Sequence, residues 1–404
     1  MNQKKTILVL ASTYPRWEGD HEPRFIHELC KRLTTQFNVI ALVPDSQNAD
    51  PSGIFDDIEV IRYRYAPKHM QSLVNNGGIV ANLKNYLWKW LLVPGFFISQ
   101  YLYVKHLLNN RKIDAIHAHW LLPQGWIAQT LAKKHNIPFI VTSHGGDLYG
   151  LRGKFLTSIK KQVAESSTAM TVVSSAMEDY LKSQNIYPKK LQIIPMGIDL
   201  KSRFVPNSTI ERKDFELLFV GRLVPKKGVT FLLEALTVLI KTHPHLRLKI
   251  VGFGPEEARL KAQVQTLNLE KVVNFVGALP QEHLPQLYQS ATIFVAPFIR
   301  ADNGDQEGLP VALMEAIGCQ CPVIVGQVAG IEDLLGSDIK NIAINPQNIT
   351  ALVKAILEIL ENPNTALERS ERIRNNTISF IDWENVSQQY AQLIQESIEQ
   401  FHKD

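Results

Sequence analysis

The sequence predicts an α/β protein built from two doubly wound parallel-sheet domains that face an interdomain cleft, and three observations support this fold class. The chain has 404 residues, which exceeds what one hydrophobic core usually serves. Short apolar runs alternate with longer amphipathic stretches along the chain, as expected of a parallel sheet with helices on both faces. A polar, proline-bearing stretch at residues 201–214 interrupts this rhythm, which then restarts.

The first series of apolar runs defines an N-terminal domain. The stretches between the runs carry apolar residues at helical spacing, for example Phe25, Ile26, Leu29 and Leu33. This alternation predicts a Rossmann-like domain over residues 1–203. Its strands are expected at residues 5–12, 37–43, 114–120, 138–145 and 169–175.

The second series of runs defines a C-terminal Rossmann-like domain over residues 204–383, followed by a helical stretch at about 384–404. Parallel sheets of this kind bind ligands at the carboxyl ends of their strands. Candidate site residues are therefore sought directly after each run. The strands of this domain are expected at residues 215–221, 246–252, 272–277, 291–298, 321–326 and 341–346.

The composition excludes several classes of protein. Apolar residues at 45% and charged residues at 20% describe an ordinary globular chain. Cys30, Cys319 and Cys321 lack the number and spacing of a disulfide framework or a zinc site, which favours a reducing, cytoplasmic compartment. The apolar run from Ile7 to Ala11 is too short for a signal peptide, and no uninterrupted run reaches the roughly 20 residues that span a bilayer. No nucleic-acid partner is expected.

The charge divides unequally between the two halves. Residues 1–203 hold 25 Lys and Arg against 15 Asp and Glu, a net of +10, whereas the remainder holds 18 against 24, a net of −6. A basic half that carries the aromatic, apolar stretch 86–108 fits peripheral contact with anionic lipid headgroups, because each cation near such a surface contributes about 1 kcal/mol. A solvated basic face above a buried helix explains the pattern equally well.

Residues 302–316, DNGDQEGLPVALMEA, place a helix start between two predicted strands. Pro310 suits the first helical turn. The amides of Gly308, Leu309 and Val311 should then be free to bind phosphate or sugar oxygens.

Two glutamates flank this helix start. Glu307 lies at its lip, and Glu315 lies about a turn and a half into the helix among apolar residues. A lone helical glutamate more often complements the helix dipole or lies in solvent. In so apolar a segment, however, the carboxylate requires a polar partner, and a pair of ribose hydroxyls would serve.

A second motif, FVGRLVPKKGV at residues 219–229, follows another predicted strand. Arg222 and Lys227 come between the strand and the next helix, where a guanidinium and an ammonium neutralise a diphosphate, whose charge grows when its bond to a sugar breaks. By itself the motif is equally consistent with a solvated basic turn, and the nearby glutamate helix favours the diphosphate site.

Together GRLVPKKG and EGLPVALME, with Glu307 and Glu315 at E-x7-E spacing, resemble the retaining, nucleotide-sugar-dependent glycosyltransferases of family 4, which have the GT-B fold. IIPMGID, VGFGPEEARL and FVGALP resemble further landmarks of that family, so the resemblance covers nearly the whole chain. It implies that Arg222 and Lys227 hold the donor diphosphate, that Glu315 holds the ribose, and that Glu307 holds the donor sugar with residues 308–311. It also implies that the tail crosses back to the first domain near Trp383.

The first half resembles the same family with more departures. Gly19 stands where relatives have a two-glycine loop, and a glycine lets a phosphate approach the backbone closely, although an ordinary turn explains the same letters. Asp20, His119 and Asp147 are expected acceptor-side contacts, and His144 is similar to the active-site histidine of the family. The expected catalytic set is His144, Arg222, Lys227 and Glu307.

The resemblance implies transfer of a hexosyl group from a UDP- or GDP-sugar to a hydroxyl of a glycan or lipid-linked acceptor, with the anomeric configuration kept, in polysaccharide or glycolipid biosynthesis. The nucleotide sugar is the donor substrate, so no cofactor is expected. His117 and His119 have no third zinc ligand, and Asp302 and Asp305 fit loop positioning or acceptor contact better than metal binding. No metal is therefore expected.

Two other functions stay open on the sequence. A sugar-nucleotide epimerase of the same fold would act without an acceptor, and a non-catalytic two-domain protein would close on its ligand without chemistry. Turnover of nucleotide sugars distinguishes an enzyme from the binding protein. The expected acceptor loops lie within residues 45–110, and the expected location is cytoplasmic, with peripheral contact at the cytoplasmic face of the membrane.

Overall fold

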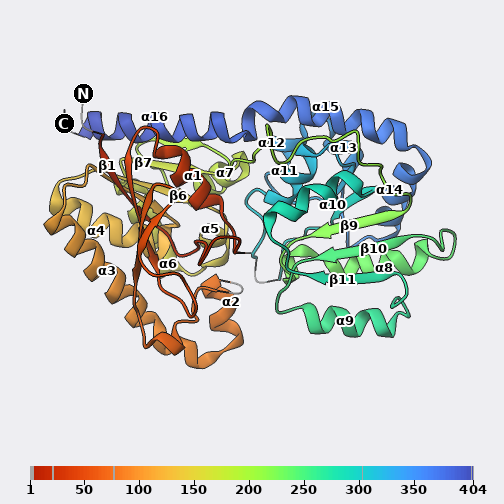
Figure 1. The fold of residues 1–404 in the computed structure, drawn as a ribbon, viewed down its shortest axis with the longest axis horizontal. Coiled ribbons are helices and arrows are strands. Elements are labelled where there is room, and N and C mark those ends of the chain that lie inside the picture. The colour runs from red at the N-terminus through yellow and green to blue at the C-terminus, as the bar shows by residue number, and fades with distance from the viewer. Residues whose placement is uncertain (1–3, 21, 76–77, 303, 402, 404) are drawn as a thin grey trace. The chain divides into compact units, whose positions relative to one another are not determined.

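The computed structural model describes residues 4–20, 22–75, 78–302, 304–401 and 403, which form two compact units (Figure 1). Unit 1 comprises Met1–Gly197 with Glu384–Asp404, and unit 2 comprises Ile198–Trp383. Each unit is a largely parallel sheet with helices on both faces. The prediction of two Rossmann-like, doubly wound domains is therefore confirmed.

Over its described residues, unit 1 contains an eight-stranded sheet in the order β3-β4-β2-β1-β5-β6-β7-β8, with β3 antiparallel to β4 and the other pairs parallel. The five predicted strands form its centre. The sequence prediction missed β3, β4 and β8, which lie toward the edges and carry charged or half-exposed residues in place of a continuous apolar run. The strands are β1 (Thr6–Leu10), β2 (Asn38–Pro44), β3 (Gly53–Phe55), β4 (Ile58–Tyr63), β5 (Ala115–His119), β6 (Phe139–Ser143), β7 (Ala169–Val172) and β8 (Leu191–Ile193).

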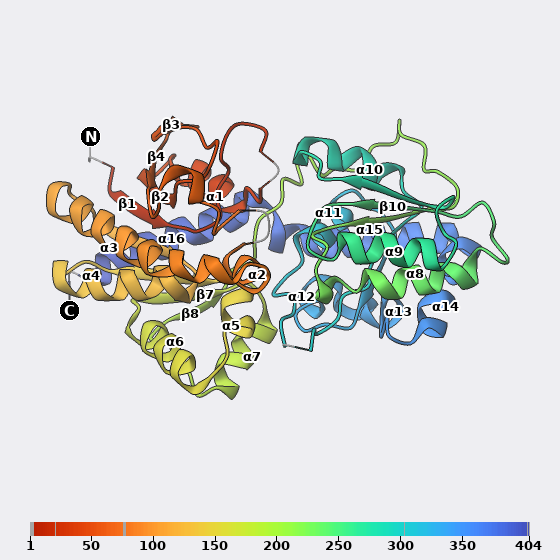
Figure 2. The same cartoon turned by 90° about the horizontal axis from the view of Figure 1, so that it is seen from below.

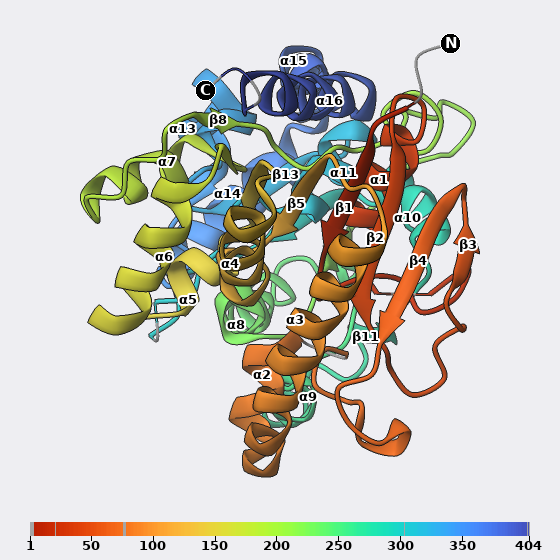
Figure 3. The same ribbon diagram turned by 90° about the vertical axis from the view of Figure 1, so that its left-hand side faces the viewer.

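The helices of unit 1 cover both faces of this sheet, with α1 and α16 on one face and α3, α4 and α6 on the other (Figures 1 and 3). The predicted apolar stripe of α1 is buried at Ile26, Leu29 and Leu33. Helix α16 packs through Tyr390, whose hydroxyl lies 3.4 Å from Thr171 Oγ1 of β7. The helices are α1 (Phe25–Leu33), α2 (Gly78–Asn85), α3 (Leu92–Asn110), α4 (Trp126–His135), α5 (Gly146–Gly150), α6 (Lys154–Ser166), α7 (Ser175–Ser183) and α16 (Trp383–Phe401).

Unit 2 contains a parallel sheet in the order β11-β10-β9-β12-β13-β14. Each of these strands falls within a predicted range, because all six are short apolar runs bounded by polar or glycine residues. The strands are β9 (Glu216–Val220), β10 (Arg247–Val251), β11 (Val273–Gly277), β12 (Ile293–Ala296), β13 (Val323–Gly326) and β14 (Ala343–Ile344).

Two groups of helices enclose the sheet of unit 2: α8, α9 and α14 lie on one face, and α10, α11, α12 and α15 lie on the other (Figures 1 and 2). Among the described residues, no helix of either unit is long and apolar enough to cross a membrane. The helices of this unit are α8 (Val229–Leu239), α9 (Glu257–Thr266), α10 (Leu284–Ser290), α11 (Val311–Gly318), α12 (Glu332–Leu335), α13 (Ile339–Ile342), α14 (Ile349–Glu361) and α15 (Pro363–Ile381).

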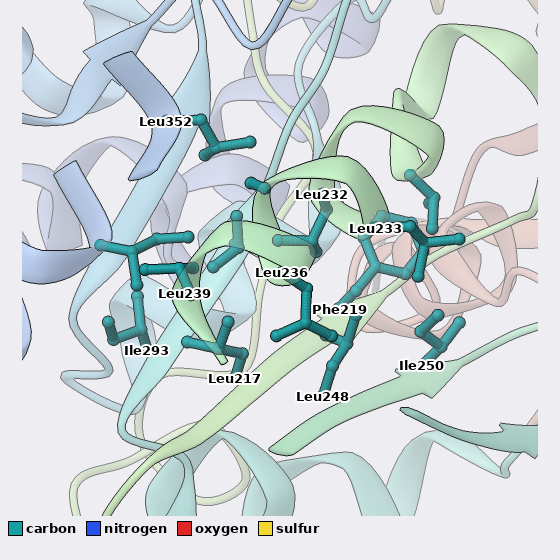
Figure 4. Packing of buried hydrophobic residues seen from close by; sticks show 14 of the residues in the cluster. Leu217, Phe219, Leu232, Leu233, Leu236, Leu239, Leu248, Ile250, Ile293 and Leu352 are labelled. Atoms are coloured by element: carbon teal, nitrogen blue, oxygen red, sulfur yellow. The ribbon is translucent and has the colours of Figure 1, made fainter. Parts of the chain in front are cut away.

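The core of unit 2 lies between its sheet and α8 (Figure 4). Phe219 of β9 and Ile250 of β10 point from the sheet toward Leu232 and Leu236 of α8, and Leu352 of α14 packs against the same helix. Each of these side chains is fully buried, and burial of one such side chain contributes about 2 kcal/mol. This packing holds the carboxyl end of β9 rigidly in place.

The boundary between the units lies earlier than predicted. Ile198 forms a parallel bridge with Asp382, accepts a hydrogen bond from the Trp383 amide and donates one to Ile381. Leu200 packs so closely on α11 that a Cβ atom at Gly318 would lie 2.5 Å from its side chain. Residues 198–203, predicted as the end of the first domain, therefore belong to unit 2.

Candidate active site

The loop between β9 and α8 carries the predicted cations, and glycines determine its path. Gly221 and Gly228 adopt φ values of +154° and +64°, which favour glycine. A Cβ atom at Gly228 would lie 1.9 Å from the carbonyl oxygen of Pro297, which follows β12. The loop can therefore pack against the end of β12, from which the chain continues to the glutamates.

This packing brings the ammonium groups of two lysines close to one carboxylate. Lys226 Nζ and Lys227 Nζ each lie 3.4 Å from Glu307 Oε1. Lys226 Nζ also lies 3.2 Å from Asp305 Oδ1 and donates a hydrogen bond of 3.1 Å to the carbonyl oxygen of Gln306. Lys226, Lys227 and Glu307 therefore form one charged cluster.

The electrostatics of this cluster keep Glu307 ionised. Burial by itself would raise the pKa of Glu307, but the charges of Lys226 and Lys227 outweigh it and lower the pKa to about 2. Burial likewise opposes the charge of Lys226, yet Glu307 and Asp305 together raise its pKa above the usual value. The loop after β12 therefore carries a permanent negative charge that holds two cations.

Lys227 has the environment expected of an anion-binding ammonium. It is buried, and its Nζ lies 4.5 Å from the centre of the Phe298 ring. Burial lowers the pKa of Lys227, the charge of Glu307 offsets this in part, and the charges of Lys226 and Arg222 lower the pKa further. A bound anion would compensate both the burial and the repulsion among these cations. A Cβ atom at Gly221 would lie 3.6 Å from Nζ, so glycine leaves the space beside the ammonium open.

At the start of α11, Gly308, Leu309 and Pro310 are buried. Pro310 is the residue before the first helical residue and provides no side-chain cap. In the part of the chain that the structure describes, the amides of Gly308, Leu309 and Val311 donate no hydrogen bond to the protein. Unpaired amides at a helix start favour anions.

Glu315 lies in a different environment from Glu307. Its carboxylate is almost fully buried and accepts hydrogen bonds from Gln281 Nε2 at 3.0 Å and from the Tyr288 hydroxyl at 2.9 Å. Burial raises the pKa of Glu315 to about 7, although both hydrogen bonds oppose the shift. The polar partner that the sequence argument required is thus supplied by protein side chains. Arg203 extends this network by donating to Gln281 Oε1 at 3.1 Å.

In unit 1, His144 follows β6 and contacts His119 at the end of β5. His119 Nδ1 and His144 Nε2 are 2.9 Å apart, and the two rings stack with an interplanar angle of 15°. Burial lowers the pKa of His144 to about 3 and also lowers the pKa of His119 well below its usual value. Both imidazoles are therefore neutral at physiological pH. Within the described residues, His144 Nδ1 and His119 Nε2 are buried and have no hydrogen-bond partner.

Asp147 supports the loop of His144. Its carboxylate accepts hydrogen bonds from the Leu121 amide at 2.8 Å, the Ser143 hydroxyl at 2.9 Å and the His144 amide at 3.2 Å. This carboxylate is buried, and its oxygens are occupied by the unit's own groups. The expected acceptor contact of Asp147 is corrected to a positioning role for His144.

The loop after β1 needs a similar correction. Asp20 accepts hydrogen bonds from Arg16 at the backbone amide, Nε and Nη2, at 2.8, 2.8 and 2.6 Å. It is buried in this pairing and stabilises the loop instead of facing an acceptor. Gly19 has φ +76°, and a Cβ atom there would meet nothing within 4 Å. The positive φ of the turn thus accounts for the glycine, and the space beside its Cα atom is empty of protein atoms.

Several residues that complete these clusters were not among the predicted site residues. Lys226 carries no local signal that separates it from a solvated lysine, and Tyr288 and Gln281 lie far from Glu315 in the sequence. The His117 ring shares a hydrogen bond of 2.8 Å with Thr142 Oγ1, and its centre lies 4.3 Å from that of the His119 ring at an interplanar angle of 37°. In the described ranges, no group of three His, Cys, Asp or Glu side chains is placed to hold a metal ion.

Residues 23–202 match the family described as Glycosyltransferase Family 4, and residues 201–380 match the family described as Glycosyl transferases group 1. A protein of Salmonella typhimurium that bears the name of a colanic acid biosynthesis glycosyltransferase is 29% identical over 237 residues. That match covers 58% of this chain and 58% of the relative.

Solved structures share the whole fold at low sequence identity. Sucrose-phosphate synthase from Thermosynechococcus elongatus has a TM-score of 0.80 at 22% identity, covering 97% of this chain and 99% of the other. HepE of Anabaena, solved with UDP-glucose, has a TM-score of 0.74 at 16% identity, covering 97% and 99%. The chain belongs to glycosyltransferase family 4 and has the GT-B fold.

Proposed function

We propose that the chain transfers a hexosyl group from a UDP- or GDP-sugar to a hydroxyl of a glycan or lipid-linked acceptor, with retention of the anomeric configuration and without a metal. The observation that carries the proposal is the partly buried cluster of Lys226, Lys227 and Glu307, together with the amides at the start of α11 that have no partner among the described residues. Clustered cations with unpaired amides are suited to a diphosphate. The naming of relatives for polysaccharide biosynthesis and the UDP-glucose complex of HepE agree with this assignment.

In the proposed reaction, the bond between the anomeric carbon and the diphosphate oxygen breaks, and the diphosphate keeps the electron pair. Lys227 and Arg222 stabilise the negative charge that develops there, and one such contact is worth on the order of 3 kcal/mol of transition-state stabilisation. The acceptor oxygen bonds to the same face of the anomeric carbon, and its proton passes to the departing phosphate. Protein side chains hold the reactants and need not act as a base.

Glu307 and the amides of Gly308 and Leu309 would hold hydroxyls of the donor sugar, because the carboxylate stays ionised beside its two lysines. His144 would contact the sugar from unit 1 as a neutral imidazole. Glu315 would bind ribose hydroxyls by exchanging the hydrogen bond from Gln281 for one from the ligand.

The test is turnover of a panel of UDP-, GDP- and ADP-sugars by the full chain, with bacterial lipid and glycan fractions as acceptors and release of the nucleotide as the readout. The Lys227→Ala variant should lower kcat/KM by about 100-fold or more. The Lys271→Ala variant, which removes an exposed lysine of the same unit, should leave kcat/KM unchanged.

The structure of the product discriminates among the remaining alternatives. NMR of the product should show the donor's anomeric configuration, and a chelator should not reduce the rate. Conversion of a nucleotide sugar without any acceptor would identify an epimerase instead. Binding of nucleotide sugars without release of nucleotide in every acceptor fraction would favour a binding protein.

A further inference from the structure

A band of exposed apolar side chains runs over the 3₁₀ turn Leu87–Leu91 and the first half of α3 in unit 1. The exposed fractions of its members lie between 45% and 80%, with Leu87 and Leu91 at 79% and 80%. Scattered single apolar residues on a surface are ordinary, but a contiguous group indicates a binding surface. We call this group the apolar ridge, and it consists of Leu87, Trp88, Trp90, Leu91, Ile98 and Leu102.

The 3₁₀ turn exposes its apolar side chains and buries its charged one. In the segment Tyr86 to Leu91, the one charged residue, Lys89, points inward and is 7% exposed, whereas the apolar residues face outward. Lys89 Nζ donates to Asn82 Oδ1 at 2.6 Å and to the Ser72 carbonyl oxygen at 3.0 Å, and it lies 4.5 Å from the centre of the Tyr86 ring. In water alone, the opposite arrangement would be more stable, because burial of an ammonium is costly and exposure of leucine gains nothing.

Helix α3 cannot rotate to bury its part of the ridge. The opposite side of the helix is packed, with Phe96 against the rings of Tyr63 and Tyr65 at 5.6 and 5.3 Å. At its start, a Cβ atom at Gly95 would lie 2.4 Å from the Tyr65 carbonyl oxygen. Figure 3 shows α3 on the face of the unit 1 sheet opposite α1 and α16. The ridge is therefore a rigid, outward-facing feature of the fold.

The charge near the ridge indicates what it contacts. Residues 60–113, which include the whole ridge, contain eight Lys and Arg and no Asp or Glu. Along the exposed stripe of α3, Ile98 and Leu102 are followed at helical spacing by Lys105 and His106. Arg111 is paired with Glu59 at 2.7 Å, but a second copy of this chain would still bring its own Lys105 and Lys112 against these charges, which opposes self-association. Anionic headgroups complement them.

From these observations we propose that the apolar ridge docks unit 1 on an anionic phospholipid bilayer. Leu87, Leu91, Ile98 and Leu102 enter the boundary between headgroups and acyl chains, and Trp88 and Trp90 lie at the headgroup level, where amphipathic rings are favoured. Because the packed side of α3 stays on the sheet, the helix lies parallel to the membrane surface. This surface is independent of the proposed donor site and does not require turnover.

The experiment measures binding of the full chain to lipid vesicles without any nucleotide sugar, so that it is decided separately from the transferase proposal. Vesicles of phosphatidylcholine with phosphatidylglycerol should bind the protein, vesicles of phosphatidylcholine alone should bind it far less, and added salt should weaken binding. The Leu87→Ser, Leu91→Ser double variant should bind on the order of 100-fold more weakly, since each leucine is worth about tenfold. Its melting temperature should be unchanged, because both side chains are already exposed.

The matched control is Phe155→Ser, which removes an equally exposed apolar side chain (76%) at the start of α6 in the same unit. This variant should bind vesicles as the wild type does. Failure of the wild type to bind phosphatidylglycerol vesicles overturns the proposal, as does equal binding by the double variant. Concentration-dependent dimerisation that the double variant abolishes, with no vesicle binding, would show that a second copy occupies the ridge instead.

Discussion

Replacement of Glu315 by glutamine should make unit 2 more stable at alkaline pH than the wild type. In the wild type, the buried carboxylate of Glu315 accepts hydrogen bonds from Gln281 and Tyr288, and it must carry a negative charge once it ionises. A glutamine has the same shape, can accept from Gln281 through its oxygen and can donate to the Tyr288 hydroxyl. The variant therefore keeps the hydrogen bonds and removes the buried charge.

The magnitude follows from the pKa of Glu315, which is about 7 in the folded chain against 4.5 for an ordinary glutamate. Below 4.5 the group is protonated in both folded and unfolded chains and has no effect. Between 4.5 and about 7 only the unfolded chain ionises, so the free energy of unfolding falls as the pH rises. A difference of about 2.5 units at about 1.36 kcal/mol each is worth about 3 kcal/mol above pH 7.

Urea unfolding of the full chain at pH about 5 and about 8 measures this difference, with hydrogen exchange of the α10 and α11 amides assigning the transition to unit 2. The Glu315→Gln variant should nearly match the wild type at the lower pH and exceed it by up to about 3 kcal/mol at the higher. The control, Glu282→Gln, changes a largely exposed carboxylate and should have no effect. A gap that is equal at both pH values, or a less stable variant at pH about 8, would refute the reasoning.

Three further predictions concern stability. Glu307→Gln should lower the free energy of unfolding of unit 2 by about 3 kcal/mol near neutral pH, because the folded-state pKa of about 2 lies below the ordinary 4.5. In the wild type this stabilisation is present above pH 4.5 and is lost as the pH falls toward 2. An acid titration followed by circular dichroism will detect the loss. Gly228→Ala should destabilise unit 2 by about 3 kcal/mol or more in thermal unfolding, because the new Cβ atom would lie 1.9 Å from the carbonyl oxygen of Pro297. The control, Gly277→Ala, also has a positive φ but lies in open space, so it should destabilise the unit by only about 1 kcal/mol. Tyr390→Phe should cost unit 1 less than about 1 kcal/mol in urea unfolding, because the hydroxyl contact is long, while Tyr390→Ala should cost about 3 to 5 kcal/mol by leaving a cavity.

The strands and helices that flank the site were predictable because their signals are local. The apolar run of β12, the proline at residue 310 and the apolar stretch of α11 are all contained in one segment, so the helix start could be placed without coordinates. The same holds for the cation loop, whose glycines mark its bends. Edge strands such as β8 were missed because they bury little apolar surface.

The partners of the site carboxylates were not predictable in the same way. The sequence predicted that Asp20 and Asp147 contact the acceptor. In the structure, the Asp20 carboxylate accepts a hydrogen bond from Arg16, and the Asp147 carboxylate accepts one from the backbone amide of His144. Their roles depend on which donors the folded loops bring within hydrogen-bond distance. No spacing rule relates residues that are adjacent only in three dimensions.

The sequence by itself determined the fold class, the family and the positions of the cations and glutamates along the chain, because short-range periodicity and motif spacing are properties of neighbouring residues. The tertiary structure decided that Glu307 pairs with Lys226 and Lys227, that Glu315 is buried against Tyr288 and Gln281, and that the ridge on α3 faces outward. Burial and charge pairing set the ionisation of these groups, and both depend on contacts between segments that are distant in the chain.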